Sequence, residues 1–189
     1  MVARARRGRL LPWWLIVVAM VAGCAGPPVR QTESRPPPVP REVVSVRDPE
    51  KIADAVWYAF SLVDRHYRFG GRNPDSGLDC SGMISHIYER MAGIRLPHNA
   101  ARIAALTRPI PESALEAGDL VFFEIDGQRY AHMGLYAGGR RFVHAPSSRG
   151  KYIRIDRLDD EYWARRLSAS HSLRPDRLLG YDTRLEPRP

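Results

Sequence analysis

Hydrophobic side chains first recur at a regular spacing after residue 48, and the spacing is that of a helix. Asp48 can cap such a helix, Pro49 suits its first turn, and Glu50 favours the positive end of its dipole. The apolar residues that follow lie on one helical face: Ile52, Ala55, Val56, Ala59, Phe60 and Val63. The folded domain is therefore predicted to begin at Asp48 with a helix that buries one side.

Two further helices and then a series of strands are predicted downstream. After a loop at 68–79, a second helix begins at Cys80 and ends at Gly93, and a short alanine-rich helix covers about 99–106. From Gly118 onward the pattern predicts strands at 119–125, 132–137, 141–145, 152–156 and within 167–173. Helices followed by strands favour an α+β domain over 48–174, with N-terminal helices packed on a mostly antiparallel sheet, and an irregular tail over 175–189.

The first 23 residues carry a targeting pattern. Four arginines without an acidic residue precede an apolar run from Leu10 to Ala22, which is shorter than the roughly 20 residues of a transmembrane helix. We therefore expect residues 1–23 to be a signal peptide. The run ends in Val21-Ala22-Gly23-Cys24, which resembles a bacterial lipobox and implies cleavage before Cys24 and its lipidation. An ordinary secretory signal and an uncleaved anchor are the alternatives.

A lipidated Cys24 would attach the protein to a membrane, since two or three acyl chains anchor a protein stably. Ala25 stands where an aspartate would favour the inner membrane, so the resemblance implies the periplasmic face of the outer membrane. Residues 24–47 are rich in proline and have no helical or strand period, which predicts an extended tether. A leader without any spacing role is the alternative.

The net charge of the chain is halved when residues 1–23 are removed. The 29 Lys+Arg against 21 Asp+Glu give a net charge of +8 and a pI near 10.0, which by itself suggests nucleic-acid binding. Four of these positive charges lie in the signal peptide, which leaves a mature net charge of +4. We therefore expect no nucleic-acid partner. The two cysteines are too few for a disulfide-stabilised scaffold.

Cys80 is the leading candidate for a reactive group. With Cys24 assigned to lipid it has no disulfide partner, and a free thiol in an oxidising compartment is either buried or used. Its place after Asp79, at the start of a helix, puts it among backbone amides that favour the thiolate. The small neighbours Ser81 and Gly82 leave room for a substrate. An inert buried cysteine is the alternative.

Two histidines on neighbouring strands are the candidates to activate this thiol. His132 and His144 are joined across Gly138-Gly139, and the turn decides whether they share a face of the hairpin. A two-residue loop places them on opposite faces. A three-residue loop or a β-bulge pairs Gly134 with His144 and brings the two imidazoles together. We therefore predict the odd loop or a bulge.

The other four histidines fit the thiol less well. His86 follows Cys80 by six residues, about 240° around the helix, and so points elsewhere. For His66, His98 and His171, at segment ends or near the tail, we expect a surface or capping role.

A nucleophilic cysteine at a helix N-terminus, with a strand histidine and a group that orients it, is the arrangement of a papain-like cysteine hydrolase. Here the chain resembles the NlpC family of cell-wall cysteine peptidases, and it looks most like the compact lipoprotein members. The motifs that carry the resemblance occur in the expected order over about 53–173: Tyr67-Arg68-Phe69-Gly70-Gly71, Leu78-Asp79-Cys80-Ser81-Gly82, Leu96-Pro97, Ala117-Gly118-Asp119-Leu120-Val121-Phe122-Phe123, His132-Met133-Gly134-Leu135-Tyr136 and Phe142-Val143-His144-Ala145.

The resemblance implies a papain-like, NlpC-type fold and a division of roles among three residues. Cys80 would be the nucleophile, His132 the general base and then the general acid, and His144 the residue that holds the far nitrogen of His132. The implied substrate is the peptide part of peptidoglycan, cleaved either at the D-glutamyl–diaminopimelate bond or at a D,D cross-link. The resemblance implies neither a metal nor a cofactor, and we expect a monomer.

Three more residues are implied to form the substrate-binding or oxyanion region. Tyr67 would lie beside the thiol, Asp79 would help to receive the amine of the peptide, and Ser81 adjoins the nucleophile. A packing role for Tyr67 and a simple helix cap for Asp79 are the alternatives. After Leu96-Pro97 the chain departs from the family, because His98, Asn99 and Ile103 replace the usual Arg, Ser or Thr, and Gln: this change bears on the substrate cleft.

Three competing functions remain open at this point. A wall-binding lipoprotein of the same fold would be catalytically silent, although Cys80, His132 and His144 are all present. A same-fold amidase or acyltransferase would act on another substrate. A Cys/His zinc site has suitable ligand types, but no short CxxC or HxxxH pair supports it.

Overall fold

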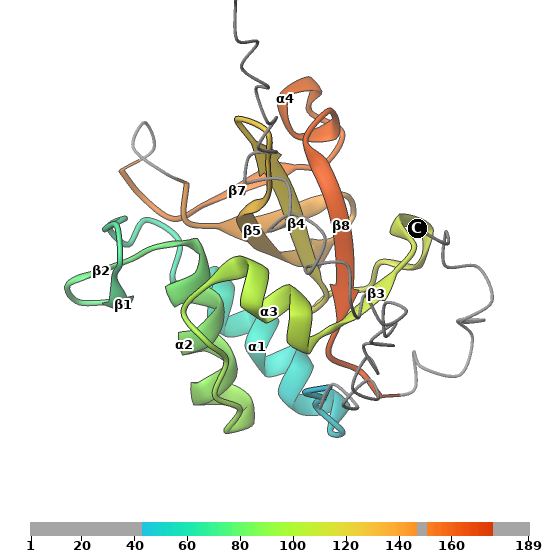
Figure 1. The fold of residues 1–189 in the computed structure, drawn as a ribbon. Helices are drawn as coiled ribbons and strands as arrows, with labels where there is room; N and C mark the ends of the chain where they lie inside the picture. Colours follow the sequence, from blue (N-terminus) through green and yellow to red (C-terminus); the bar gives the residue numbers. More distant parts are fainter. Residues whose placement is uncertain (1–42, 147–150, 176–189) are drawn as a thin grey trace, which may run out of the picture. The chain divides into compact units, whose positions relative to one another are not determined.

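The computed structural model describes residues 43–146 and 151–175, which form a set of helices and a six-stranded sheet (Figure 1). The helices are α1 (Pro49–Ser61), α2 (Cys80–Ala92), α3 (Ala100–Leu106) and the short α4 (Glu161–Ala164), with a 3₁₀ turn at Glu112–Ala114. The predicted signal peptide, Cys24, the tether up to residue 42 and the tail from residue 176 lie outside the described residues. Inside the described ranges, no helix is both long enough and apolar enough to cross a bilayer.

Side-chain caps determine where the first two helices begin: the cap at Asp48 was predicted, and the cap at Asp79 was the alternative to its substrate-binding role. Asp48 accepts a hydrogen bond from a backbone amide of α1 (3.0 Å), and Asp79 accepts one from the Gly82 amide of α2 (2.7 Å). α2 ends at Gly93, whose φ of 67° is a left-handed conformation that glycine adopts readily. Because Asp79 is the cap, Cys80 becomes the first residue of α2.

The sheet has the strand order β3-β8-β4-β5-β6-β7, and each neighbouring pair is antiparallel. The strands are β3 (Arg108–Ile110), β4 (Leu120–Ile125), β5 (Gln128–Gly138), β6 (Arg141–His144), β7 (Arg154–Arg157) and β8 (Leu167–Ser172). A separate hairpin is formed by β1 (Arg72–Asn73) and β2 (Gly77–Leu78). The predicted α+β class is therefore confirmed.

Some boundaries differ from the prediction for local reasons. β7 covers 154–157 instead of 152–156, because Tyr152 forms an isolated bridge with His66 before the strand begins. The elements β1, β2, β3 and α4 were not predicted. Each has only two to four residues, too few to display a helical or strand period.

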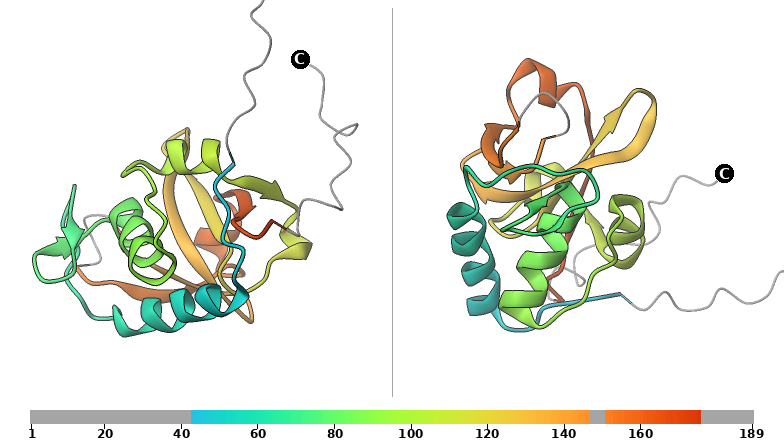
Figure 2. Two further views of the ribbon diagram at one scale, coloured as in Figure 1. Left: turned by 90° about the horizontal axis from the view of Figure 1, so that it is seen from below. Right: turned by 90° about the vertical axis from the view of Figure 1, so that its left-hand side faces the viewer.

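The two faces of the sheet pack against different partners. One face turns Phe122, Met133 and Leu135 toward a core that includes the buried sides of α1, α2 and α3. The opposite face carries Phe123 and Phe142, which pack with Trp163 of α4. Figures 1 and 2 show α1, α2 and α3 together on one side of the sheet, with α4 away from them. His132 and His144 belong to the face that meets α4.

The hairpin between β5 and β6 contains the irregularity that the sequence analysis required. Leu135 pairs with Val143 and Gly138 pairs with Arg141, with a register shift between Tyr136 and Gly138. This shift is a bulge in β5, and it places Gly134 opposite His144. The prediction that an odd loop or a bulge brings the two histidines to one face is confirmed.

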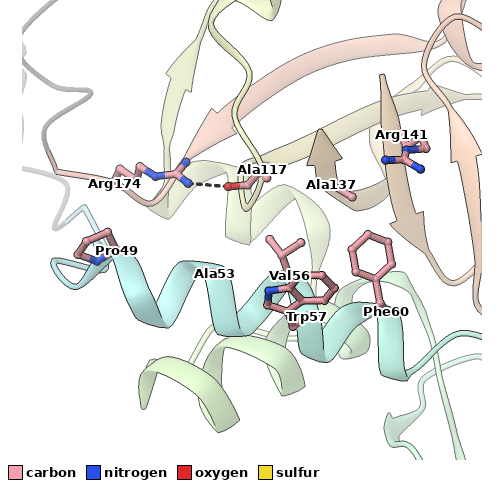
Figure 3. Close-up of a pocket in the computed structure, with 9 residues that line it drawn as sticks. All are labelled: Pro49, Ala53, Val56, Trp57, Phe60, Ala117, Ala137, Arg141 and Arg174. Atoms are coloured by element: carbon pink, nitrogen blue, oxygen red, sulfur yellow. Dashed lines mark hydrogen bonds between the residues drawn. The ribbon is translucent and has the colours of Figure 1, made fainter. Parts of the chain in front are cut away.

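A surface groove elsewhere in the domain is not lined by these histidines. It is an apolar groove of about 660 Å³ between α1 and the end of β5, where Trp57 is 72% exposed (Figure 3). Arg141 and Arg174 line its polar edge, and a guanidinium nitrogen of Arg174 donates to the carbonyl oxygen of Ala117. The candidate chemistry therefore lies outside this groove.

Candidate active site

Cys80 is partly exposed at the N-terminus of α2, with its sulfur next to the backbone of β5. Burial raises the pKa of the thiol to about 11, and the Asp79 carboxylate contributes to this rise. Hydrogen bonds from backbone amides, including that of Met133, act in the opposite direction. The expectation that the helix terminus favours the thiolate is therefore wrong for the resting site, because burial outweighs it. The thiol needs a base.

His132 and His144 are hydrogen-bonded to each other, and His132 directly precedes Met133, whose backbone amide hydrogen-bonds the Cys80 sulfur. Nε2 of His132 lies 2.8 Å from Nδ1 of His144, and the residues are only 6% and 0% exposed. Burial lowers the pKa of both imidazoles, to about 3 for His132, where the adjacent His144 adds to the effect. Both rings are therefore neutral near pH 7, the state in which a histidine can accept a proton. The catalytic roles of the pair stay predictions.

Asp156 and Trp163 complete this cluster, although neither was a candidate in the sequence analysis. Oδ2 of Asp156 accepts hydrogen bonds from Nε2 of His144 (3.0 Å) and from Nε1 of Trp163 (2.8 Å). The indole ring stacks on His132, with centroids 5.5 Å apart and planes at 24°. Asp156 lies in a strand that was predicted, but the long connection from His144 left its register undefined.

The charge state of Asp156 follows from its donors. Burial acts to raise the pKa of the carboxyl group, but hydrogen bonds from His144, Arg154 and Trp163 hold it well below its usual range. Asp156 is therefore a carboxylate at neutral pH. The cluster thus ends in a fixed negative charge that faces the far nitrogen of His144.

The three residues predicted around the thiol meet at the N-terminus of α2. Burial raises the pKa of Tyr67, and Cys80 and Asp79 are the next contributors, so its hydroxyl lies near both groups. The Asp79 carboxylate accepts hydrogen bonds from the Ser81 hydroxyl (3.1 Å) and from Nε2 of His98 (2.7 Å), besides capping α2. Ser81 is buried, with its hydroxyl directed at Asp79.

Two expectations about the remaining histidines are wrong. His98 is not a surface or capping residue, because its side chain is 9% exposed and lies between Asp79 and Nε of Arg72, which donates to its Nδ1. His171 is buried in β8 and hydrogen-bonded to the Thr107 hydroxyl (3.0 Å). In both cases tertiary packing brings a partner from a distant part of the chain.

His86 and His66 lie where the sequence placed them. His86 points away from Cys80 and contacts the Tyr58 hydroxyl through Nε2 (2.9 Å), and His66 is exposed. In the part of the chain that the structure covers, no three His, Cys, Asp or Glu side chains are grouped so that they could hold a metal ion.

Comparisons with known proteins connect this chain to one family. The model of the NlpC/P60 family matches residues 64–172. Murein DD-endopeptidase MepH of Escherichia coli (strain K12) is 39% identical over 106 residues, which are 54% of this chain and 39% of that protein. Murein DD-endopeptidase MepS/Murein LD-carboxypeptidase of the same strain is 34% identical over 53% of this chain and 51% of its own length. The chain thus spans about half or less of these relatives.

A solved structure extends the match to the fold. The crystal structure of a protein similar to lipoprotein, NLP/P60 family, from Staphylococcus aureus subsp. aureus Mu50 superimposes with a TM-score of 0.60. The two proteins are 31% identical, and the match covers 69% of this chain and 44% of that chain. The family model covers more than half of the chain and includes Cys80, His132 and His144, so the chain belongs to the NlpC/P60 family.

Proposed function

We propose that the protein is a cysteine peptidase that hydrolyses amide bonds in the peptides of peptidoglycan. The observation that carries the proposal is the hydrogen-bonded pair of His132 and His144, next to the Met133 amide that bonds the Cys80 sulfur, in a chain of the NlpC/P60 family. Relatives that are named murein endopeptidases support the choice of substrate.

In the proposed reaction, His132 accepts the thiol proton of Cys80 on Nδ1, since its Nε2 is engaged with His144. The sulfur then adds to the carbonyl carbon, and the Cys80 backbone N–H stabilises the developing oxyanion. His132 returns the proton to the leaving amine. A water molecule, deprotonated by the same nitrogen, finally releases the acyl group from the sulfur and restores the thiol.

Tyr67 and Asp79 are proposed to position the substrate in this reaction. The Tyr67 hydroxyl lies near the thiol and can donate to the oxyanion or to the peptide. The Asp79 carboxylate adjoins the nucleophile and can attract a free amine, although hydrogen bonds from α2 and His98 already engage it. His98, which departs from the family pattern, thus occupies part of the hydrogen-bonding capacity of Asp79 in the cleft.

Digestion of purified muropeptides, with mass identification of the products, tests the function. Wild type should cleave them, Cys80→Ala should not, and His86→Gln should behave as wild type because His86 faces α1. Product masses will distinguish cleavage at the D-glutamyl–diaminopimelate bond from cleavage of a D,D cross-link. Intact muropeptides after incubation with folded wild type would refute the proposal.

We also propose that lipidation of Cys24 holds the protein, as a monomer, at the periplasmic face of the outer membrane. The lipobox-like sequence before Cys24 supports the anchor, and so does the similarity to a staphylococcal protein described as similar to lipoprotein. Cells fed labelled palmitate should label wild type but not Cys24→Ala, with the label in the outer-membrane fraction. Sedimentation of the detergent-solubilised protein should give the mass of one chain. Equal labelling of Cys24→Ala would contradict the anchor.

A further inference from the structure

We propose that Asp156 is a positioning residue that, acting through His144, sets the tautomer of His132 so that Nδ1 is the nitrogen free to accept the Cys80 proton. The inference deepens the proposed function and rests on it. Nothing in the motifs around Cys80, His132 or His144 indicates this residue, because it lies on β7, at the edge of the sheet.

Four hydrogen-bond donors converge on one oxygen of Asp156. Oδ2 accepts from Nε2 of His144 (3.0 Å), from Nε and Nη2 of Arg154 (3.0 and 2.8 Å), and from Nε1 of Trp163 (2.8 Å). β6 and β7 pair in regular register, with Phe142 opposite this residue. The carboxylate is therefore held in place from its own strand, from β6 and from α4.

The hydrogen-bond network transmits this arrangement to His132. Because Asp156 is a carboxylate, it can only accept, so Nε2 of His144 must carry a proton. A neutral His144 then has a lone pair on Nδ1, which accepts from Nε2 of His132. His132, also neutral, is thereby left with an unprotonated Nδ1. The negative end of the network thus selects the base form of His132.

The same network favours the charged state that the reaction creates. When His132 takes the proton from Cys80, its positive charge is adjacent to His144, which is bonded to the Asp156 carboxylate. The other groups facing the two imidazoles are Phe142 on β6, Phe123 on β4, Arg154 on β7 and Trp163 on α4. Arg154 opposes the positive charge, but its guanidinium is itself paired with Asp156.

Trp163 contacts both His132 and Asp156, the two ends of the hydrogen-bond network. Its ring stacks on His132 with the planes at 24°, while its Nε1 donates to Asp156 (2.8 Å). A side chain in this position restricts rotation of the His132 ring and covers it from solvent. The selected tautomer is therefore presented in one orientation.

Two substitutions at Asp156 separate the effect of its hydrogen bonds on the tautomers from the effect of its negative charge. In Asp156→Asn, the four converging donors favour the amide oxygen at the Oδ2 position, which keeps the tautomers but removes the negative charge. Asp156→Ala removes both. Asp159→Asn is the matched control, because Asp159 also pairs with an arginine two residues before it and is exposed.

The variants are compared by kcat and KM on muropeptides and by the ring ¹⁵N shifts of His132. We expect kcat to fall on the order of 100-fold in Asp156→Ala and about 10-fold in Asp156→Asn, with KM unchanged and Asp159→Asn like wild type. In wild type and Asp156→Asn, the shifts should show a protonated Nε2 and a free Nδ1. In Asp156→Ala they should show a mixture of tautomers.

The spectroscopic arm needs no substrate, so it separates this inference from the proposed function. A wild type that cleaves no muropeptide but shows the expected change of tautomer in Asp156→Ala would refute the substrate and support the inference. Unchanged His132 shifts in folded Asp156→Ala would overturn the inference, and so would a kcat within twofold of Asp159→Asn.

Discussion

Replacing Gly134 by alanine should disable the site while leaving the catalytic side chains intact. Gly134 lies on β5, two residues after His132 and opposite His144 on β6. A Cβ at this position would lie 2.7 Å from Cδ2 of Phe142, 3.0 Å from the Val143 carbonyl oxygen and 3.2 Å from Cβ of His144. Carbon atoms in contact prefer about 3.5–4.0 Å, so these neighbours must move.

The size of the expected losses follows from the tight packing of the side chains around Gly134. Phe142 is fully buried, and its ring packs against Phe123 (5.0 Å between centroids), Trp163 (5.3 Å) and His144 (4.8 Å). Since the ring cannot turn into solvent, the added methyl should cost about 1–3 kcal/mol of unfolding free energy. The displacement passes to His144 and stretches its 2.8 Å hydrogen bond to His132. Misplacement by up to 1 Å is expected to lower kcat by as much as about 100-fold.

Urea unfolding and muropeptide kinetics on the same samples test this reasoning. The control is Gly127→Ala, at a hairpin tip where no atom lies within 4 Å of the new methyl but φ is +74°. This backbone strain should cost about 1–2 kcal/mol, so the control matches the loss of stability without touching the site. A Gly134→Ala enzyme with kcat within twofold of wild type would refute the argument, and so would an equal loss in Gly127→Ala.

Three further predictions concern pH and the surroundings of the thiol. Burial lowers the pKa of His171 to about 4, although its hydrogen bonding to Thr107 opposes the shift, and the unfolded chain takes up this proton near pH 6.5. The contribution of neutral His171 to the free energy of unfolding is therefore fully present above pH 6.5 and falls by up to about 3 kcal/mol toward pH 4. Urea unfolding should show a smaller loss over this range in His171→Gln than in wild type. Asp79→Ala should lower the free energy of unfolding by about 2 kcal/mol in thermal unfolding, because the helix cap and the partner of His98 are lost together. A loss no larger than that of Asp48→Ala, which removes an exposed cap, would contradict this prediction. Tyr67→Phe should lower kcat on the order of 100-fold at an unchanged Tm, whereas an unchanged kcat would leave Tyr67 a packing residue.

The parts of the fold that the sequence predicted are those governed by short-range rules. Asp79 and Gly93 bound α2 because a cap and a left-handed stop act within a few residues. The sharing of a face by His132 and His144 also follows from a local count, since side chains alternate along a strand and the turn joins the two strands directly. These local rules were sufficient to place Cys80 at the start of α2 and the two imidazoles on one face of the hairpin.

The parts that were missed depend on contacts between distant segments. Asp156 is separated from His144 by a long connection, so its pairing with Phe142 depends on tertiary packing and has no turn to define it. His98 is held by hydrogen bonds to Arg72, on the β1–β2 hairpin, and to Asp79, which lie 26 and 19 residues away along the chain. The thiol pKa was misjudged for a related reason: the field at a helix terminus is local, whereas burial depends on the whole fold.

The bulge in β5 determines which side chains of this hairpin share a face of the sheet. Alternate residues of a strand face opposite sides of the sheet, so adding or deleting one residue within the paired segment between His132 and the bulge would turn His132 toward the helices. A change of two residues would keep both imidazoles on the face that meets α4. Viable length variants of this paired segment should therefore differ in steps of two, whereas a longer turn can absorb a single residue.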